Sequence, residues 1–237
     1  MTAAIETVDL TGEPPSRVQS AAFYAVKDLR RGDKVVLVTA QEPTLLMQSL
    51  DLQLRHNLAW TMVEADGKWR IEVSHRADAG PRDVLELLER DHKRLDRLFT
   101  QALQLLNRNE AAGAAPLLRE FAAALKRHMA VEDDVLAPIF ATATGAAGDD
   151  PLSIMLREHA DIRQQLAVIA ECLAGDAPET GEIGAFCAIL AGTLAKHEHR
   201  EENNLFPRWR AVWARRTDAE RSQMMARVEA ALRPGDE

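Results

Sequence analysis

Residues 128–138 read HMAVEDDVLAP, and a related segment, HEHREENNLFP, follows 69 residues later at 197–207. Each copy begins with a histidine, has a glutamate four residues later and ends with a proline ten residues after the histidine. Side chains four residues apart project from the same face of a helix. The repeat therefore predicts two equivalent helices, each directing an imidazole and a carboxylate to one side. The two pairs are His128 with Glu132 and His197 with Glu201.

A shorter repeat precedes each of these copies. Arg90-Asp91-His92 corresponds to Arg157-Glu158-His159, which lies 67 residues later, and an apolar residue follows each histidine by three positions. Four histidines and two glutamates thus recur as two copies of one helix-pair unit, which is a pattern typical of a metal site. The six candidate ligands are His92, His128, Glu132, His159, His197 and Glu201.

Apolar residues follow a helical period from Pro81 onward, and no strand pattern is found there. We expect an all-α antiparallel four-helix bundle with an extra C-terminal helix. Asp150 before Pro151 predicts an N-cap, Thr217-x-x-Glu220 predicts a capping box, and Pro207 should kink or interrupt the fourth helix. The expected helices span residues 81–109, 116–143, 151–175, 180–206 and 217–233.

The six candidate ligands should lie at one level of this bundle. With a rise of about 1.5 Å per residue, all six fall within one or two turns of the same layer, and His128 shares its helical face with Phe121 and Val135. Burying an isolated carboxylate costs several kcal/mol, whereas the whole stability of a domain is about 5–15 kcal/mol. One buried histidine would be explained as a hydrogen-bonded core residue. Four histidines with two glutamates in phase indicate a bound cation.

Imidazole and carboxylate ligands without thiolate suit iron, manganese or zinc. Six protein ligands are more than one tetrahedral zinc ion uses. We therefore expect two ions, with Glu132 and Glu201 as bridging ligands and the four histidines as terminal ligands. Asp133, Glu158 and Glu198 adjoin ligands in the sequence, and we expect them to be solvated or to support the ligands.

The first part of the chain follows a different pattern. Short strands and helices alternate in the order β-α-β-α-β-β, which predicts an α+β two-layer sandwich. Lys34–Thr39 is rich in β-branched residues, as strands are, and Asp66-Gly67 is typical of a tight hairpin turn. The expected regions are 1–76 for this domain, 77–80 for a linker, 81–215 for the bundle and 216–237 for the last helix and tail.

Composition narrows the function classes. The chain has 237 residues, a formal net charge of −8 and 28% charged residues. This charge disfavours nucleic acid or an anionic membrane as a partner, no apolar run is long enough to span a bilayer, and the N-terminal residues lack a signal-peptide pattern. Cys172 and Cys187 lie on apolar helical segments and are interpreted as reduced thiols. We expect a cytoplasmic protein.

The order His, His-x-x-x-Glu, His, His-x-x-x-Glu over residues 81–210 resembles the hemerythrin-like (HHE cation-binding) family. It is most similar to bacterial di-iron proteins implicated in repairing nitrosative and oxidative damage to iron centres. The resemblance implies two non-haem iron ions at the six candidate ligands, with zinc or manganese as alternative occupants. The resemblance to the oxygen carriers is weaker, because their site uses five histidines and no fifth histidine in this chain is in phase. The missing ligand implies a coordination position open to water, oxygen or nitric oxide.

Residues 5–76 resemble an uncharacterised bacterial family related to the TusA/SirA sulfur carriers. The matching residues are Asp9-Leu10-x-Gly12-x-Pro14-Pro15 and the strand and helix order after them. Sulfur carriers hold a reactive cysteine where their first helix begins, and this chain has no cysteine before Cys172. We therefore do not expect sulfur transfer. We expect a docking or regulatory domain through which a protein partner would bind.

These patterns leave three functional hypotheses. The first is a di-iron protein that binds or responds to oxygen, nitric oxide or peroxide, in stress protection or in the repair of iron centres. The second is a metal-regulated interaction module, or an iron storage or delivery protein, without gas chemistry. The third is an enzyme such as a peroxidase or oxidase, which would need a substrate pocket beside the metals.

Overall fold

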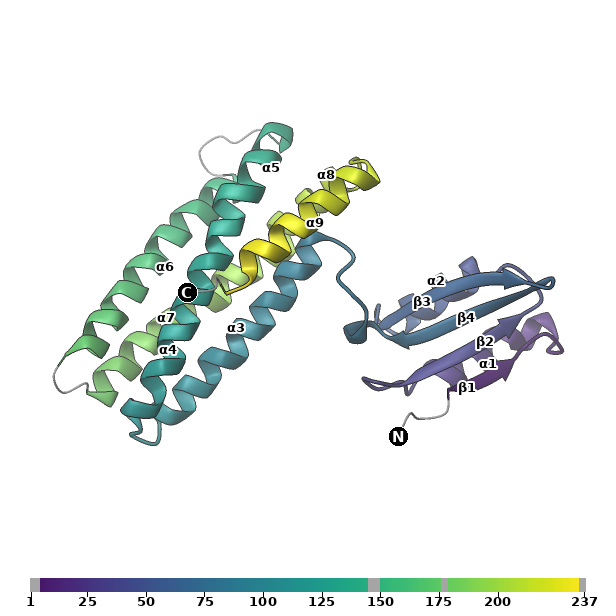
Figure 1. The fold of residues 1–237 in the computed structure, drawn as a ribbon, viewed down its shortest axis with the longest axis horizontal. Coiled ribbons are helices and arrows are strands. Elements are labelled where there is room, and N and C mark those ends of the chain that lie inside the picture. Colours follow the sequence, from purple (N-terminus) through teal and green to yellow (C-terminus); the bar gives the residue numbers. More distant parts are fainter. Residues whose placement is uncertain (1–4, 145–149, 176–178, 235–237) are drawn as a thin grey trace. The chain divides into compact units, whose positions relative to one another are not determined.

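The structure is a computed structural model that describes residues 5–144, 150–175 and 179–234. The chain divides into two compact units, Met1–Gly80 and Pro81–Glu237. The first contains a small sheet and the second is helical (Figure 1). Within the described ranges, no helix combines the length and the apolar character needed to cross a bilayer.

The N-terminal unit is a four-stranded sheet with two helices. Its sheet has the order β1-β2-β4-β3, in which β1 is parallel to β2 and the other neighbours are antiparallel. The elements follow one another as β-α-β-α-β-β, which is the order that the sequence predicts. They are β1 (Glu6–Asp9), α1 (Pro15–Val26), β2 (Lys34–Thr39), α2 (Thr44–Gln53), β3 (Leu58–Ala65) and β4 (Lys68–His75).

The core of this unit lies between the sheet and the two helices. Alternate residues of a strand share one face, so Val35 and Leu37 of β2 lie on the same side and pack in one buried cluster with residues of α1 and α2. The hairpin between β3 and β4 turns at Asp66 and Gly67, whose φ angles of 53° and 71° are those of the predicted tight turn.

The link between the units begins later than the sequence predicts. Arg76–Asp78 forms a short 3₁₀ helix, and the His75 side chain accepts a hydrogen bond from the Ala77 N–H at its start. The Asp78 carboxylate accepts a hydrogen bond of 2.7 Å from the N–H of Gly32. This contact holds the first part of the expected linker in the N-terminal unit.

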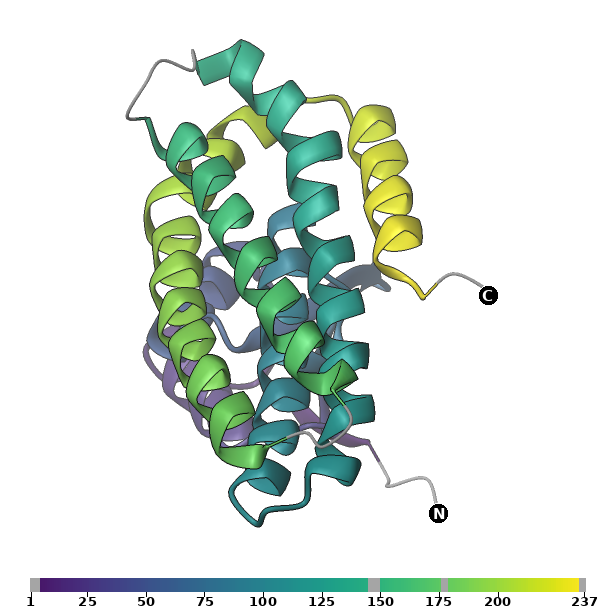
Figure 2. The ribbon, with the colours of Figure 1, turned by 90° about the vertical axis from the view of Figure 1, so that its left-hand side faces the viewer.

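The C-terminal unit is built from long helices that run antiparallel to their neighbours (Figure 2). Two π-helical segments, Val131–Leu136 and Glu201–Leu205, join α4 to α5 and α7 to α8 in continuous helical runs. Both α3 and α6 pack against α4 and α7, and α9 packs along α3 and α4. The helices are α3 (Val84–Leu106), α4 (Ala111–Ala130), α5 (Ala137–Thr144), α6 (Pro151–Ala174), α7 (Thr180–Arg200), α8 (Phe206–Trp213) and α9 (Asp218–Leu232).

Local chemistry decides where these helices begin. The predicted caps are confirmed: the Asp150 side chain accepts hydrogen bonds at the start of α6, and a capping box formed by Thr217 and Glu220 begins α9. The first bundle helix begins at Val84 rather than at Pro81, because Asp83 is extended and caps the N–H of Glu86.

The second bundle helix begins earlier than the sequence predicts. It starts at Ala111, and Pro116 lies inside it rather than at its first position. Four of the five residues before this proline are alanines. Because alanine has the highest helix propensity, this segment remains helical despite the backbone hydrogen bond that Pro116 cannot donate.

Two apolar clusters fill the bundle, and a polar layer separates them. Along α3, Leu88 belongs to one cluster and Leu95 to the other. Along α6, Met155 and Ile162 are divided in the same way. His92 and His159 lie between these residues, so α3 and α6 place the two histidines at the level of the polar layer. Both cysteines lie away from this layer as free thiols, Cys187 buried in a cluster and Cys172 partly exposed beside it.

Candidate metal centre

Both glutamates of the repeated motif lie at the start of a π-helical segment. The residue before each proline, Pro138 or Pro207, donates its backbone N–H to the carbonyl of the glutamate five residues back, Glu132 or Glu201. Proline has no N–H, and its ring crowds the carbonyl four residues before it, so the helix widens by one residue there. The predicted kink or interruption at Pro207 is therefore a widened turn, after which the helix continues as α8.

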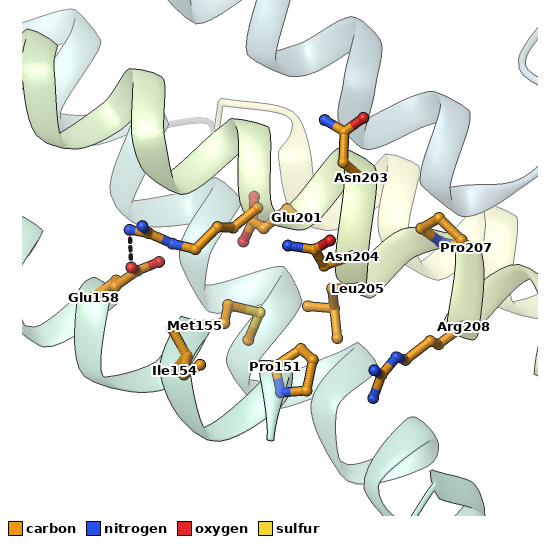
Figure 3. A pocket seen from close by; sticks show the side chains of 11 residues that line it. Pro151, Ile154, Met155, Glu158, Glu201, Asn203, Asn204, Leu205, Pro207 and Arg208 are labelled. Atoms are coloured by element: carbon orange, nitrogen blue, oxygen red, sulfur yellow. Dashed lines mark hydrogen bonds and ion pairs between the residues drawn. The ribbon is translucent and has the colours of Figure 1, made fainter. Parts of the chain in front are cut away.

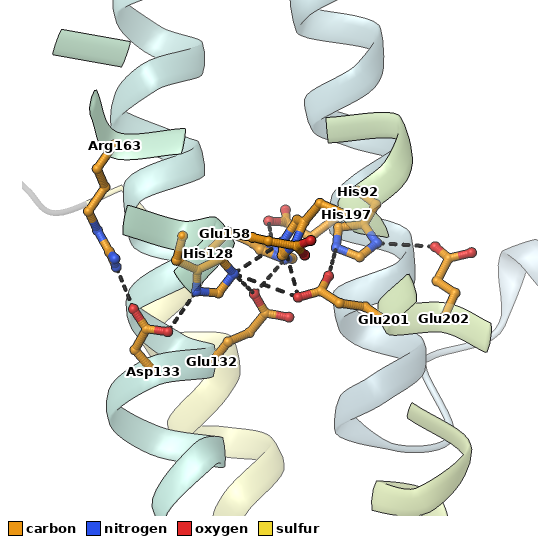
Figure 4. A network of polar contacts seen from close by, with 11 residues as sticks. His92, His128, Glu132, Asp133, Glu158, Arg163, His197, Glu201 and Glu202 are labelled. Atoms are coloured by element: carbon orange, nitrogen blue, oxygen red, sulfur yellow. Dashed lines mark hydrogen bonds and ion pairs between the residues drawn. The ribbon is translucent and has the colours of Figure 1, made fainter. Parts of the chain in front are cut away.

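All six predicted ligands meet in the polar layer, and each is at most 3% exposed. Their ligand atoms form two groups, in each of which the atoms lie within 4.8 Å of one another. Glu132 and Glu201 belong to both groups, and they lie at the middle of the network (Figure 4). The first group adds His92 and His128, and the second adds His159 and His197.

The distances within the layer suit ligands of a common ion. Two atoms that each lie about 2.1 Å from one ion are about 3.0–3.4 Å apart at angles between about 90° and 110°. The nearest distances between an imidazole Nε2 and a carboxylate oxygen fall close to this range. They are 3.4 Å for His92–Glu201, 3.4 Å for His128–Glu132, 3.4 Å for His159–Glu132 and 3.1 Å for His197–Glu201.

Six of the inward-facing atoms have no hydrogen bonds to explain their burial, whereas Nε2 of His159 and Nε2 of His197 lie 3.1 Å from each other. In the described part of the chain, Nε2 of His92 and His128 and both carboxylate oxygens of Glu132 and Glu201 are buried without a hydrogen-bond partner. Each such group costs about 1–3 kcal/mol, and a charged group costs more. A cation would satisfy all of them at once. The residues present therefore fit a metal centre.

The charges in the layer depend on one another. Burial opposes the ionisation of Glu132 and Glu201, but the surrounding imidazoles outweigh it and lower the pKa of both carboxyls. Burial also opposes the protonation of His159, yet Asp133 and the two glutamates raise its pKa to about 11. Protons can thus balance the carboxylates when no metal is bound, and they must leave when a metal binds.

The other ring nitrogen of each histidine, Nδ1, is held by a carboxylate. We call these four residues the outer carboxylates. A carboxylate in this position fixes the orientation of a metal-binding histidine and raises its basicity. The pairs are Asp91 with His128 at 2.9 Å, Asp133 with His159 at 2.6 Å, Glu158 with His197 at 3.0 Å and Glu202 with His92 at 3.1 Å.

The sequence predicts supporting roles for only part of this set. The sequence leaves Asp133 and Glu158 either solvated or supporting the ligands, and the structure places both against ligands. Asp91 and Glu202 also support ligands, which the sequence analysis does not predict. The repeat could have predicted all four outer carboxylates. In both copies an acid precedes the first histidine, and another acid follows the glutamate.

Glu198 and His199 lie beside the layer without joining it. Burial raises the pKa of Glu198 to about 7, and the nearby charge of Asp96 acts in the same direction, against the lowering effect of His92. Glu198 is therefore a partly buried acid and not one of the outer carboxylates. His199 is exposed and contacts Asn203, so it faces away from the layer.

A pocket of about 530 Å³ opens beside the second group of ligands. Glu201 and Glu158 form part of its wall, and Met155 and Leu205 supply apolar surface (Figure 3). Arg200 pairs with Glu158 in the same wall. The pocket brings a space of small-molecule size next to the candidate ligands on the α6 side of the bundle.

Comparison with protein families finds a match to the hemerythrin HHE cation binding domain over residues 83–232. The matched region includes all six candidate ligands, the outer carboxylates and α9.

Several curated proteins are similar to this chain, and the three described below carry the name iron-sulfur cluster repair protein YtfE. The protein of Pectobacterium carotovorum subsp. carotovorum is 33% identical over 90 residues, which are 35% of this chain and 41% of the relative. The protein of Musicola paradisiaca is 28% identical over 162 residues, which are 62% of this chain and 73% of the relative. The protein of Yersinia pseudotuberculosis serotype IB is 31% identical over 107 residues, which are 43% and 47% of the two chains.

The matched part thus spans less than half the length of the Pectobacterium and Yersinia relatives. No solved structure matches this chain.

Proposed function

Because this chain belongs to the family of hemerythrin HHE cation-binding proteins, we propose that its polar layer holds two non-haem iron ions. His92 and His128 would bind one ion, and His159 and His197 the other. Glu132 and Glu201 would bridge them, since both belong to both groups of ligand atoms. Zinc and manganese are the alternative occupants that this ligand chemistry allows.

One observation carries this proposal. The Nδ1 atoms of the four histidines are all held by the outer carboxylates, while the oxygens of Glu132 and Glu201 are buried without hydrogen bonds among the described residues. If these histidines were ordinary core residues, they would hydrogen-bond the oxygens of Glu132 and Glu201, and these oxygens would not be left without partners.

The chain's own residues would prepare the site. The outer carboxylates accept the Nδ1 protons, which directs the Nε2 lone pairs inward. The apolar clusters above and below the layer keep water away from the ligands. Two irons held in this way would supply binding and electron transfer for a small molecule such as oxygen, nitric oxide or peroxide.

The ligand count supports a role in small-molecule binding. Six protein ligands shared by two ions leave coordination positions without a protein atom, and the pocket beside Glu201 lies on one side of the layer. The relatives are named as iron-sulfur cluster repair proteins. We therefore propose that this chain takes part in protecting or repairing iron centres under nitrosative or oxidative stress.

Metal analysis of freshly purified, untagged protein tests the proposal. We expect about two irons per chain, and an absorption spectrum that changes when nitric oxide or oxygen is added. The variants Glu132→Ala and His197→Ala should lose iron, because each removes a ligand. Asp134→Ala is the matched control, since Asp134 is an exposed acid two residues from Glu132 and should keep its iron. A wild-type protein without bound iron would contradict the proposal.

A second function follows if the iron is present but inert. Two irons per chain with no spectral response to either gas would favour iron storage, iron delivery or metal-regulated interaction. The N-terminal unit suits the last of these, because it is a compact unit of its own and the six candidate ligands belong to the other unit. Its likeness to the TusA/SirA-related family, without a cysteine at the start of α1, favours docking or regulation over sulfur transfer. A partner that is captured only by metal-loaded protein, in either redox state, would support this function.

A further inference from the structure

The outer carboxylates follow the internal repeat. In each half of the bundle, the acid before the first histidine holds the second histidine of the same half. The acid after the glutamate holds the first histidine of the other half. The two halves are therefore equivalent in which carboxylate holds which histidine. Any difference between them must come from what surrounds these acids.

Three of the four outer carboxylates are fixed by an arginine. Arg94 pairs with Asp91 at 2.7 Å, Arg163 pairs with Asp133 at 2.5 Å, and Arg200 pairs with Glu158. Glu202, which holds His92, makes no ion pair with a lysine or arginine in the described ranges. The Glu202 side chain is 39% exposed, against 16% for Asp133 and Glu158 and 8% for Asp91.

The repeat shows why Glu202 lacks an arginine. Arg163 lies four residues after His159 on α6, and the residue four positions after His92 on α3 is Asp96. The first half thus has an exposed carboxylate where the second half has a guanidinium. Figure 4 shows the two ends of the network, with Glu202 beside His92 at one end and Asp133 beside Arg163 at the other.

This difference weakens the support of His92. Water competes for an exposed carboxylate, and no ion pair holds the Glu202 side chain in the conformation that contacts His92. Both histidines of the second group, by contrast, are held by carboxylates that arginines fix. Loss of such a supporting contact changes metal affinity by about 10–100-fold.

We propose that the two ion positions are unequal, and that the ion held by His92 and His128 is the exchangeable one. This inference rests on the proposed di-iron centre. It assigns Glu202 and Asp96 as the residues that make the first position labile, and it assigns the second position to an ion that stays bound. A centre of this kind could give up or take up one ion while the other keeps the bundle ordered.

Release of iron to a chelator tests this inference. Full-length protein loaded with ferrous iron under nitrogen is mixed with excess ferrozine, and the coloured complex is followed over time. We expect two phases of one iron each, with rates that differ by about tenfold. Glu202→Ala should accelerate only the fast phase, because it removes the remaining support of His92.

The matched variants exchange the charges of the two halves. Asp96→Arg supplies the missing guanidinium and should slow the fast phase, whereas Arg163→Asp should accelerate the slow phase. Asp96→Asn removes the negative charge without supplying a guanidinium. The rate of its fast phase should fall between the rates of the wild type and of Asp96→Arg. Asp96 is exposed, so these changes leave the core intact.

Single-phase release of both irons would overturn the inference, and so would a fast phase that neither Glu202→Ala nor Asp96→Arg alters. In either case the protein would still release two irons, and the proposed function would stand. A protein that loads no iron at all would instead contradict the proposed function. The two failures are therefore distinguishable.

Discussion

In each histidine of the polar layer, an outer carboxylate holds Nδ1, which leaves Nε2 to face the centre of the layer. Nδ1 contacts an outer carboxylate, and Nε2 faces the two glutamates. In His128, for example, Asp91 lies 2.9 Å from Nδ1 while Nε2 is buried without a hydrogen bond. The carboxylate thereby selects the tautomer whose free lone pair points to the centre.

Asp91 gives a direct test of this arrangement. Asp91→Ala should lower iron affinity by about 10–100-fold, because His128 loses the contact that orients its ring. The fold should persist, since Asp91 is not part of either apolar cluster. Iron titration monitored by absorption measures the effect. Asp161→Asn, which changes an exposed acid on α6, is the control and should bind iron as the wild type does.

Iron binding should depend on pH in a defined direction. The raised pKa of His159, about 11 against an ordinary 6.5, means that this imidazole is protonated at neutral pH when no metal is bound. A metal must displace that proton. We therefore expect iron affinity to rise with pH through the neutral range and towards about pH 11, with protons released on binding. Titration in weak buffer with a pH indicator measures the release, and binding without proton release would contradict the expectation.

The stability of the metal-free protein should vary with pH for the same reason. A group with a raised pKa stabilises the fold fully below its unfolded value, so the contribution of His159 is present below about pH 6.5 and is lost as the pH rises towards about 11. Glu132 and Glu201 have lowered pKa values, so their contribution is present above about pH 4.5 and is lost on acidification. The free energy of unfolding, measured with urea, should therefore be highest between about pH 4.5 and about pH 6.5. A free energy of unfolding that stays constant from pH 6.5 to pH 10 would refute this.

The candidate ligands were predictable from the sequence because the spacing His-x-x-x-Glu occurs twice, and residues four positions apart share a helical face. The surrounding acids were harder to predict. Asp91 is an acid beside a histidine, and such an acid is usually solvated. Only the packing of α3 against α4 brings it to His128 on a different helix. Arg163 and Asp133 likewise meet across two helices, and helical spacing alone does not show this contact.

At the scale of elements, the sequence predicts where several helices and strands begin or end, but it does not predict the π-helical turns inside the helices. β2 spans Lys34–Thr39 as predicted, because its β-branched residues favour a strand. The capping box at Thr217 also begins a helix as expected. The π-helical segments were missed, because one extra residue in a turn hardly disturbs the apolar period. Their trace in the sequence is the proline that follows each glutamate by six residues.

These prolines should control the π-helical geometry. Pro207→Ala restores the N–H and removes the crowding, so ordinary α-helical hydrogen bonds become available after Glu201. A change of register by one residue turns the following side chains by about 100°, which would move Glu202 away from His92. We expect weaker iron binding, together with an equal or higher free energy of unfolding for the metal-free protein. Iron titration and urea unfolding measure the two quantities.

Pro116→Ala is the control for this experiment. Pro116 also lies inside a helix, but it is twelve residues before His128, about 18 Å along α4. Its replacement should leave iron affinity unchanged. Equal effects of the two substitutions on iron binding would show that the prolines act on general stability and not on the site.

At the scale of the whole molecule, the change from strand to helix patterns near Pro81 falls at the boundary between two compact units. The sequence shows this change because the period of the apolar residues shifts there. It could not show that Asp78 remains attached to Gly32, since that contact joins residues 46 positions apart. The six candidate metal ligands all belong to the second unit.

The two units should therefore respond differently to iron. A ligand that binds only the folded state stabilises it by RT ln(1 + [L]/Kd), which is about 2.7 kcal/mol at a hundredfold excess over Kd. We expect calorimetry of the full chain to show two transitions, of which iron raises only the one that belongs to residues 81–237. Near-ultraviolet circular dichroism of the tryptophans in each unit can assign the transitions. An equal shift of both transitions would contradict this independence.

Anomalous diffraction at the iron absorption edge, from crystals of the iron-loaded protein, tests the di-iron proposal most directly. We predict two peaks inside the bundle, one between His92 and His128 and one between His159 and His197, with Glu132 and Glu201 reaching both. A single peak, or peaks that lie away from these six side chains, would contradict it.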